Sequence, residues 1–143
     1  MSTESRAPTW RSISFLPIMF ELFGAQVREA QITYDKLMSC RPRPHVLDDA
    51  TLARVRQVFT DQRDLLPVQR DQMQRWQREA TTVEQREMLA RLSARADRLS
   101  ALHDQVLALV DELSLSTIDR LMDMSDADLA MGVLSGLFKL PGR

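Results

Sequence analysis

Residues 82–113 read TVEQREMLARLSARADRLSALHDQVLALVDEL and decide the fold of this chain. Apolar residues recur through this stretch at heptad spacing. One core row holds Leu92, Leu99, Val106 and Leu113, a second holds Met88, Arg95, Leu102 and Leu109, and a flanking row holds Leu89, Ala96, His103 and Val110. Three inward positions in seven are typical of a helix that packs against more than one neighbour, whereas a two-stranded coiled coil needs only two. The stretch therefore predicts one long helix of a helical bundle.

The composition agrees with an all-helical chain. Only four of the 143 residues are glycine and six are proline. The sequence is rich in Ala, Leu, Gln, Arg, Glu and Met, the residues that lose least on entering a helix. A chain of this length can bury a core without disulfides or metals. We therefore expect a flexible N-terminal segment at residues 1–13 and a single helical-bundle domain at residues 14–140.

The charge and the cysteine content indicate which partners and which cellular location to expect. The formal net charge of −1 disfavours a protein that coats nucleic acid. Residues 54–98 hold ten arginines and seven acidic residues, while residues 111–128 hold six acidic residues and one arginine, so opposed segments could steer partners together. With Cys40 as the one cysteine no intramolecular disulfide forms, and we expect a cytoplasmic location. The apolar run at residues 13–23 contains Glu21 and is too short to span a bilayer, so we expect neither export nor a membrane span.

Start and stop signals divide the chain into helices. The first is expected at residues 14–40, with Pro17 in its first turn. The second is expected to begin after Asp48 or Asp49 as N-cap and to end near residue 79. Inside it, Pro67 predicts a kink or a short break with recapping at Asp64.

The remaining signals define the second half of the chain. Thr81 or Thr82 has capping-box spacing and opens the third helix. Ser116 is expected to cap a short segment, and Ser125 followed by two aspartates opens a last helix at residues 126–138. These elements predict an all-α, antiparallel up-down bundle of four helices with a long central hairpin. A three-helix core with one helix docked on another subunit is the alternative.

The hairpin predicts which residues of the second and third helices face one another. With the turn near residues 80–81, Phe59 faces Leu102 and Leu66 faces Arg95. Gln62 and Gln69 occupy the neighbouring seam positions, so the candidate polar waist of the hairpin is Gln62, Gln69 and Arg95.

Arg95 needs a partner in this waist, because an unpaired charge in the interior costs several kcal/mol. The expected partners are Asp61, Asp64 and main-chain carbonyls freed by Pro67. The waist is interpreted either as a polar layer that fixes the register, with an arginine that reaches water, or as a small anion-binding pocket.

Most aromatic residues are expected at one end of the bundle. An up-down topology brings together the start of the first helix, the turn between the second and third, and the end of the last. This end defines a candidate interaction surface: Trp10, Phe15, Phe20, Phe23, Trp76, Leu137 and Phe138. Such a cluster either closes the core or forms an exposed apolar patch for a partner, a membrane or another copy of the chain.

The sequence lacks the patterns of common active sites. His45 and His103 are not spaced as metal ligands, and no Glu-x-x-His, Cys-x-x-Cys or His-Glu-x-x-His pattern occurs. No glycine-rich phosphate loop and no combination of acid, base and nucleophile can be named. We therefore expect no catalytic residue, no metal site, no cofactor and no enzymatic activity.

Three functions remain open at this level. The leading hypothesis is a non-enzymatic helical interaction or scaffold protein that forms a homo-oligomer or binds a helical partner. The second is attachment to a membrane surface or another apolar surface through residues 13–23 and 132–140. The third is nucleic-acid binding through the arginines of the second helix, Arg54, Arg56, Arg63, Arg70, Arg75 and Arg78.

Overall fold

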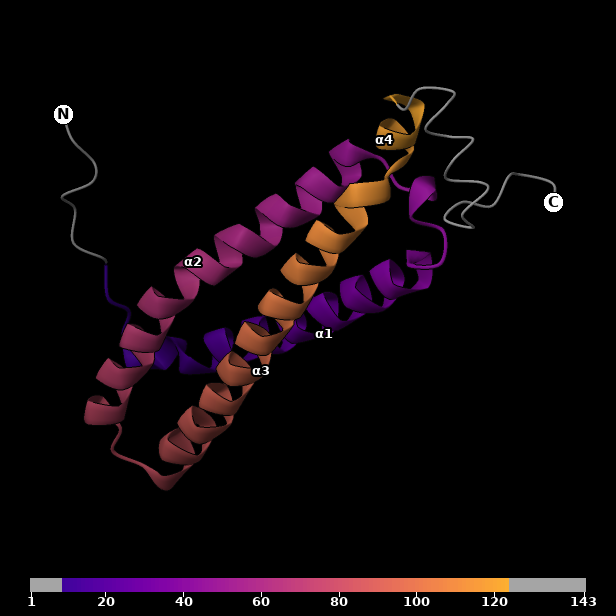
Figure 1. Ribbon diagram of the computed structural model, residues 1–143. Coiled ribbons are helices and arrows are strands. Elements are labelled where there is room, and N and C mark those ends of the chain that lie inside the picture. The colour runs from indigo at the N-terminus through magenta and orange to yellow at the C-terminus, as the bar shows by residue number, and fades with distance from the viewer. Residues whose placement is uncertain (1–8, 124–143) are drawn as a thin grey trace, which may run out of the picture.

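The computed structural model describes residues 9–123, and this part of the chain is all-helical, without a strand (Figure 1). The long helices are α1 (Leu16–Cys40), α2 (Asp49–Glu79) and α3 (Val83–Leu113), and a short α4 follows at Ile118–Asp123. Single turns of 3-10 helix lie at Ile13–Phe15 (η1), Pro44–Val46 (η2) and Ser114–Ser116 (η3). The all-α prediction is confirmed. The helix expected at residues 126–138 lies outside the described residues.

The starts of α2 and α3 are fixed by the caps that the sequence indicates. The carboxylate of Asp48 accepts a hydrogen bond from the main-chain N–H of Thr51 at 2.7 Å. At α3, the Thr82 hydroxyl accepts from the Gln85 N–H at 3.1 Å, and Gln85 Oε1 accepts from the Thr82 N–H at 3.2 Å. This reciprocal capping box satisfies two amide groups that have no partner inside the helix. The predicted helix starts are therefore confirmed.

Pro67 does not interrupt α2, which continues from Asp49 to Glu79. Of the two outcomes expected at Pro67, the break with recapping at Asp64 is therefore wrong, and the kink within a continuous helix stays a prediction. Pro67 is exposed, so the carbonyl one turn earlier that loses its N–H partner can bond water instead. Solvent access on this face allows the helix to pass through the proline.

The three long helices pack together with α3 in the middle. α3 contacts α1 along one side and α2 along another, and the chain runs up in α1, down in α2 and up again in α3 (Figure 1). The core includes buried residues from all three helices, among them Phe23, Phe59, Trp76 and Leu99. Because α3 packs against both α1 and α2, the two helices together cover its wide apolar side.

The apolar side of α3 has two edges, and each edge faces a different helix. Arg95 and Leu109 belong to the row that the sequence analysis placed against α2, but both contact α1. Arg95 lies over Phe20, and Leu109 lines a groove together with Tyr34. The expected pairing of Leu66 with Arg95 is therefore wrong, because the parallel helix α1, and not the hairpin partner, covers this edge of α3.

The other edge of the stripe faces α2. His103 lies edge-on to Phe59, with ring centroids 6.0 Å apart. Its Nε2 lies 3.1 Å from Oε1 of Gln62. Phe59 thus contacts the residue next to Leu102, so the hairpin register is close to the expected one.

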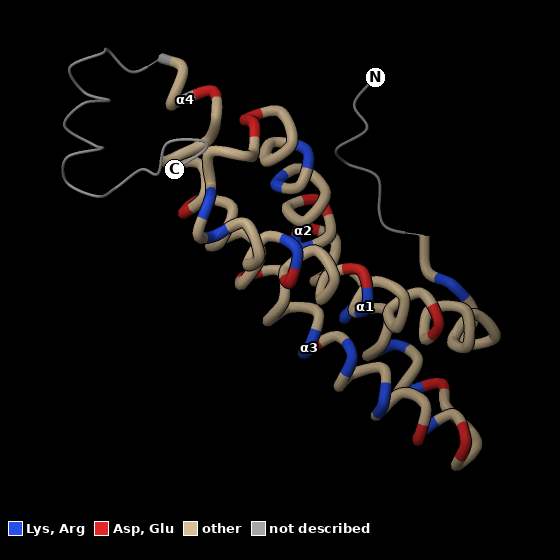
Figure 2. The backbone as a smooth tube through the Cα atoms, turned by 90° about the vertical axis from the view of Figure 1, so that its right-hand side faces the viewer, with Lys and Arg blue, Asp and Glu red and all other residues tan. Residues whose placement is uncertain are grey.

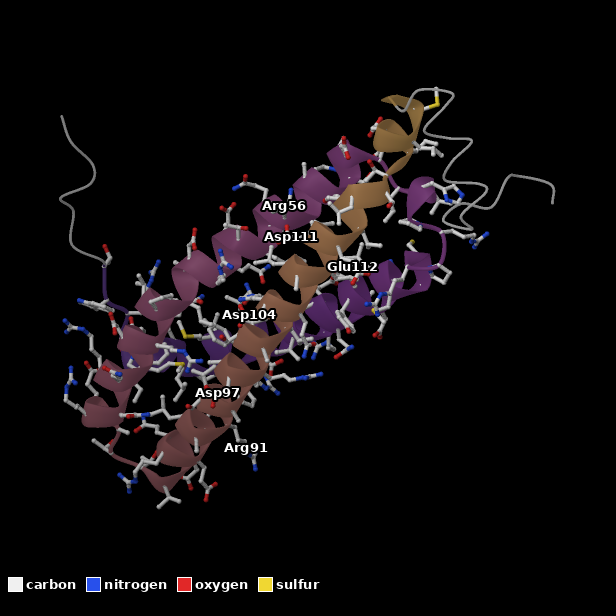
Figure 3. The ribbon with its side chains drawn as sticks, viewed as in Figure 1. Arg56, Arg91, Asp97, Asp104, Asp111 and Glu112 are labelled. Carbon is white, nitrogen blue, oxygen red and sulfur yellow. The ribbon has the colours of Figure 1, made fainter. Side chains whose placement is uncertain are left out.

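Oppositely charged rows run along the α2–α3 interface at heptad spacing. The arginines are Arg56, Arg63 and Arg70, and the aspartates are Asp97, Asp104 and Asp111. Figure 3 labels Arg56 and the three aspartates. Arg56 pairs with Asp111 at 2.9 Å and Arg70 pairs with Asp97 at 3.0 Å. Charges of both signs also occur elsewhere along the helices (Figure 2). Each exposed pair contributes little, but the spacing matches only one antiparallel register.

The segment after α3 is tied to the start of α2. Asp119 accepts a hydrogen bond from the main-chain N–H of Asp49 at 2.6 Å, and the Thr117 hydroxyl donates to the Asp49 carboxylate at 2.7 Å. The Ile118 N–H donates to the Leu47 carbonyl at 2.6 Å. These bonds hold α4 against the connection between α1 and α2.

The charged rows can be tested by reversal. Changing Arg56, Arg63 and Arg70 to glutamate places three acids opposite three aspartates, and we expect the free energy of unfolding to fall by roughly 1–3 kcal/mol at low salt. Adding Asp97→Arg, Asp104→Arg and Asp111→Arg to the same chain should restore most of this loss. Urea denaturation followed by circular dichroism measures both. A sixfold variant no more stable than the triple one would contradict the proposed pairing.

Candidate functional site

The residues before α1 are fixed to the end of α2. The main-chain N–H of Arg11 donates to Oε1 of Gln72 at 2.7 Å, and the Arg11 carbonyl accepts from the indole N–H of Trp76 at 2.9 Å. Gln72 and Trp76 are both buried, and Trp76 is 0% exposed. Residues 10 and 11 fall within the segment expected to be flexible, but a buried glutamine and tryptophan of α2 hold them in place.

Three arginines lie over three aromatic rings at this end of the molecule. The guanidinium carbon of Arg75 lies 4.0 Å from the centre of the Trp10 ring. The same distance is 5.0 Å for Arg11 over Phe15 and 3.6 Å for Arg95 over Phe20. Such cation–π contacts are each worth about 0.5–1 kcal/mol at exposed sites. They cover part of the aromatic surface with positive charge.

The contact of Arg95 depends on a glycine in α1. Arg95 donates a hydrogen bond from Nη1 to the Phe20 carbonyl. A Cβ added at Gly24 would lie 2.5 Å from Nη1 and 3.1 Å from Cζ of Arg95. Gly24 therefore leaves the space that the guanidinium occupies. The partners of Arg95 are an α1 carbonyl and an aromatic face, and not the expected Asp61, Asp64 or α2 carbonyls near Pro67.

An exposed apolar stripe runs along the first turns of α1. Phe15, Ile18 and Leu22 are spaced three and four residues apart, so they lie on one side of the helix. Their exposed fractions are 38%, 61% and 46%. Glu21 and Glu29 are exposed and flank this side of α1. We call Phe15, Ile18 and Leu22 the α1 stripe.

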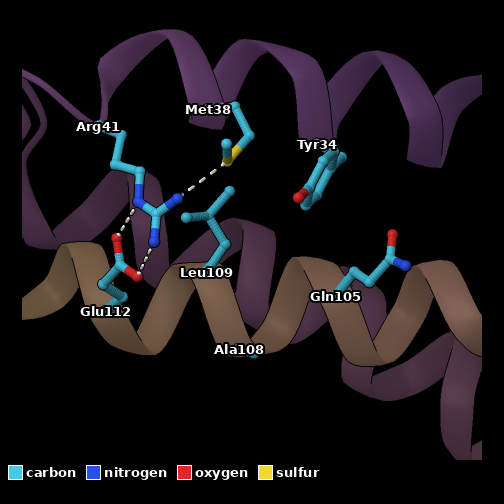
Figure 4. Close-up of a pocket in the computed structure, with 7 residues that line it drawn as sticks. All are labelled: Tyr34, Met38, Arg41, Gln105, Ala108, Leu109 and Glu112. Carbon is cyan, nitrogen blue, oxygen red and sulfur yellow. Dashed lines mark hydrogen bonds and ion pairs between the residues drawn. The ribbon is translucent and has the colours of Figure 1, made fainter.

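A shallow groove separates the C-terminal halves of α1 and α3 (Figure 4). Its volume is about 240 Å³, and its lining includes Tyr34, Met38, Gln105 and Leu109. At one end, Arg41 binds both carboxylate oxygens of Glu112, at 2.7 and 2.8 Å. This bidentate pair neutralises the arginine, so the groove presents no unpaired cation to an anionic ligand. Its clearest role is to hold the end of α1 against α3.

A second groove of about 260 Å³ lies between the first turns of α1 and α3. Its apolar lining includes Ile13, Leu16, Pro17 and Met88, and Glu84 and Gln85 also border it. The aromatic end thus has both an exposed stripe and an apolar groove, which are features of protein contact surfaces.

His103 is a buried titratable group in the α2–α3 interface. Its side chain is 0% exposed, and Nδ1 has no hydrogen-bond partner in the described part of the chain. The contact with Gln62 Oε1 assigns the proton to Nε2, which then donates. Burial lowers the pKa of His103, the nearby Asp104 raises it and Arg63 lowers it further. The fold therefore holds the neutral imidazole.

The candidate residues divide between core and surface. Phe23 and Trp76 are 0% exposed and belong to the core. Trp10, Phe15 and Phe20 lie nearer the surface, each beneath an arginine. Leu137 and Phe138 lie outside the described residues.

The candidate polar waist is not assembled as one cluster. Gln62 contacts His103 on the α2 side of α3, whereas Arg95 contacts Phe20 on the α1 side. Gln69 is half-buried on α2, in the heptad row of Gln62. No hydrogen bond links these three side chains. His103, Gln72 and Gly24 were not selected as site residues from sequence. His103 carried a signal as a member of the inward-facing flanking row of α3, and Gly24 carried one as a glycine inside a predicted helix.

Several arginines of α2 already have partners within the chain. Arg56 and Arg70 form ion pairs with α3, and Arg75 lies over Trp10. Phosphate contacts would have to compete with these interactions, so the structure gives no added support to nucleic-acid binding.

The comparisons with known proteins supply no relative. No family model, curated protein or solved structure matches the chain. Within residues 9–123, no cluster of three or more His, Cys, Asp or Glu side chains could hold a metal ion. None of the helices in this range is long and apolar enough to cross a membrane.

Gly24 and Arg95 can be tested as a pair. Alanine in a helix interior is favoured over glycine by about 1 kcal/mol, so Gly24→Ala in an Arg95→Met background should stabilise the protein by about that amount. In the wild-type background we expect this gain to be lost or reversed, because the new methyl group displaces the guanidinium from Phe20. Urea denaturation of the four chains measures the coupling. Equal effects of Gly24→Ala in both backgrounds would show that Arg95 does not depend on Gly24.

The pKa of His103 predicts how stability changes with pH. The folded chain holds the neutral ring, whereas the unfolded chain binds a proton below its ordinary pKa of 6.5. The unfolded state therefore binds more protons in acid, and the His103 contribution is complete above pH 6.5 and falls as the pH drops below it, by up to about 1.4 kcal/mol per pH unit. We expect His103→Leu to flatten this part of the curve of unfolding free energy against pH. Identical slopes for wild type and His103→Leu would contradict this assignment.

Proposed function

We propose that this protein is a non-enzymatic helical interaction protein that self-associates through the α1 stripe. The supporting observation is the exposure of Phe15, Ile18 and Leu22 on one side of a helix whose opposite side is buried. Exposed apolar side chains at helical spacing commonly mark the face that another helix covers. The cytoplasm is the proposed location, because Cys40 is the one cysteine.

A protein partner fits the stripe better than a membrane does. Membrane-surface helices usually carry lysine and arginine on the polar face, because lipid headgroups are often anionic. Here the exposed acids Glu21 and Glu29 border the stripe. These carboxylates would be repelled by an anionic bilayer, but they can pair with arginines of a second chain.

The arginines at the aromatic end suit this form of association. Arg11 and Arg75 lie over Phe15 and Trp10 near the start of the stripe. In a symmetric dimer the same surface is used twice, so the acids that flank one stripe can approach the arginines of the other. The stripe is small compared with the roughly 800 Å² per partner of a standard interface, so we expect a weak dimer that depends on concentration.

We also propose that residues 126–138 form a fourth helix, which would complete the four-helix bundle expected from sequence. The supporting pattern is Ser125 followed by Asp126 and Asp128 and then a run rich in Leu, Val and Met. Acids at the start of a helix favour its formation.

The proposed interface is tested with Leu22→Asp and a matched control. Leu22 is 46% exposed on α1, and Leu115 is 71% exposed in η3, at the other end of the molecule from the stripe. Because an aspartate in an apolar contact must lose its hydration, Leu22→Asp should weaken self-association at least tenfold, whereas Leu115→Asp should leave it unchanged. Sedimentation equilibrium over a range of concentrations measures the effect.

The self-association of the wild type and of the control variant shows whether the proposed interface is correct. A wild-type chain that stays monomeric at all concentrations would refute self-association. An equal effect of both variants would show that the stripe is not the contact surface. Flotation of the wild type with anionic liposomes that Leu22→Asp abolishes would favour the membrane alternative.

A further inference from the structure

The bundle has an open face between α1 and α2, across from α3. The start of α1 is near the end of α2, where Arg11 contacts Trp76, but the far ends of the two helices diverge (Figure 1). The residues of α1 that border this face are half-buried and follow at heptad spacing: Met19, Gln26, Thr33 and Cys40. On α2 the half-buried border row is Val55, Gln62 and Gln69. We call the region between these rows the open face.

The α2 border of the open face exposes apolar side chains. Val58 and Leu65 are 50% and 51% exposed and lie one heptad apart, so they are on the same side of α2. They adjoin the half-buried row and point away from the charged row that pairs with α3. Apolar side chains in this position are typical of a helix face that packs against another helix.

The described chain ends beside the wide end of the open face. α4 is bonded to the first residues of α2 through Asp119 and Asp49. Residues 124–143 therefore begin near the N-terminal end of α2. A helix over residues 126–140 would be about 22 Å long. Val58 and Leu65 lie about 13 and 24 Å along α2 from Asp49, so such a helix would pass Val58 and end beside Leu65.

The apolar composition of residues 126–140 is typical of a helix that packs against other helices. As a helix, it would carry leucine, valine, methionine and phenylalanine on one wide face, at Leu129, Met131, Val133, Leu134, Leu137, Phe138 and Leu140. Asp128, Ser135 and Lys139 would lie on the opposite side, so such a helix is stable when its apolar face is buried. Gly132 and Gly136 would form a flat strip along which another helix can approach closely.

Charges agree with one direction of docking. Asp126 and Asp128 stand at the start of the segment. Lys36 near the end of α1 and Arg54 near the start of α2 are both exposed at the wide end of the open face. If the helix ran parallel to α2, its acidic start would lie near these two cations, whereas the reverse direction would separate them.

We propose that residues 126–140 bind the open face as a helix, parallel to α2, and cover Val58 and Leu65. This inference rests on the proposed fourth helix and adds its position and direction. It leaves the α1 stripe free, because the helix spans only the half of the open face nearest the start of α2. The occupant is thus a segment of the same chain, and the first turns of α1 remain available to a second chain.

Paramagnetic relaxation enhancement in the full-length protein tests this placement. A nitroxide is attached at Ala50→Cys, an exposed residue in the first turn of α2, in a Cys40→Ser background, and the amide signals of residues 126–140 are observed by NMR. We expect strong broadening of the first half of this segment and helical chemical shifts throughout it. The same label at Ala101→Cys, an exposed residue on the outer side of α3, should leave the segment unbroadened. Adding Leu65→Asp should reduce the broadening produced from position 50.

The outcomes separate the possible failures. Helical shifts without broadening would overturn the placement and keep the fourth helix, whereas coil shifts would overturn both. A mixture of spin-labelled and isotope-labelled chains reports contacts between molecules. Broadening that appears equally in this mixture would assign the open face to a second copy and overturn the intramolecular proposal.

Discussion

Burial of the apolar side of α3 is the constraint on which the other elements depend. Leu92, Leu99 and Val106 are 0–1% exposed and lie where α1 and α2 both approach. Burying each such side chain contributes roughly 1.5–3 kcal/mol. Because α3 supplies both interfaces, α1 and α2 need little direct contact with each other. Their main link is at one end, where Trp76 and Gln72 hold the main chain of Arg11. The open face is a result of this arrangement.

Local features of the fold could be predicted, and the assignment of partners could not. The caps at Asp48 and Thr82 depend only on residues within one turn, so sequence spacing was sufficient. The heptad rows also identified the buried side of α3. A stripe three positions wide has two edges, however, and the pattern does not indicate which helix covers which edge. Arg95 was therefore assigned to α2, although it contacts Phe20 of α1. At Pro67 the sequence left a kink and a break both open, because the exposure that lets the helix continue is a tertiary property.

The arginines illustrate why surface chemistry is hard to infer from composition. Their density in α2 suggested a nucleic-acid surface, yet Arg56 and Arg70 are paired with aspartates of α3. The signal for this pairing was present in the sequence as two rows at matching heptad spacing. The aromatic end is a different case, because a ring beneath a guanidinium presents charge instead of an apolar surface. Within the α1 stripe, Phe15 lies beneath Arg11, whereas Ile18 and Leu22 have no such cover and present the apolar surface.

The bonds between α4 and the start of α2 have a consequence for synthesis of the chain. Thr117 and Asp119 bind Asp49, yet the ribosome makes them after α2 and α3 are complete. During translation, the first turn of α2 therefore has its own Asp48 cap but not the second set of partners from α4. The N-terminal end of α2 gains its final anchorage only when the nascent polypeptide has emerged beyond residue 119. Folding of this end is thus coupled to synthesis of residues 117–119, while the hairpin turn at Thr82 can form earlier.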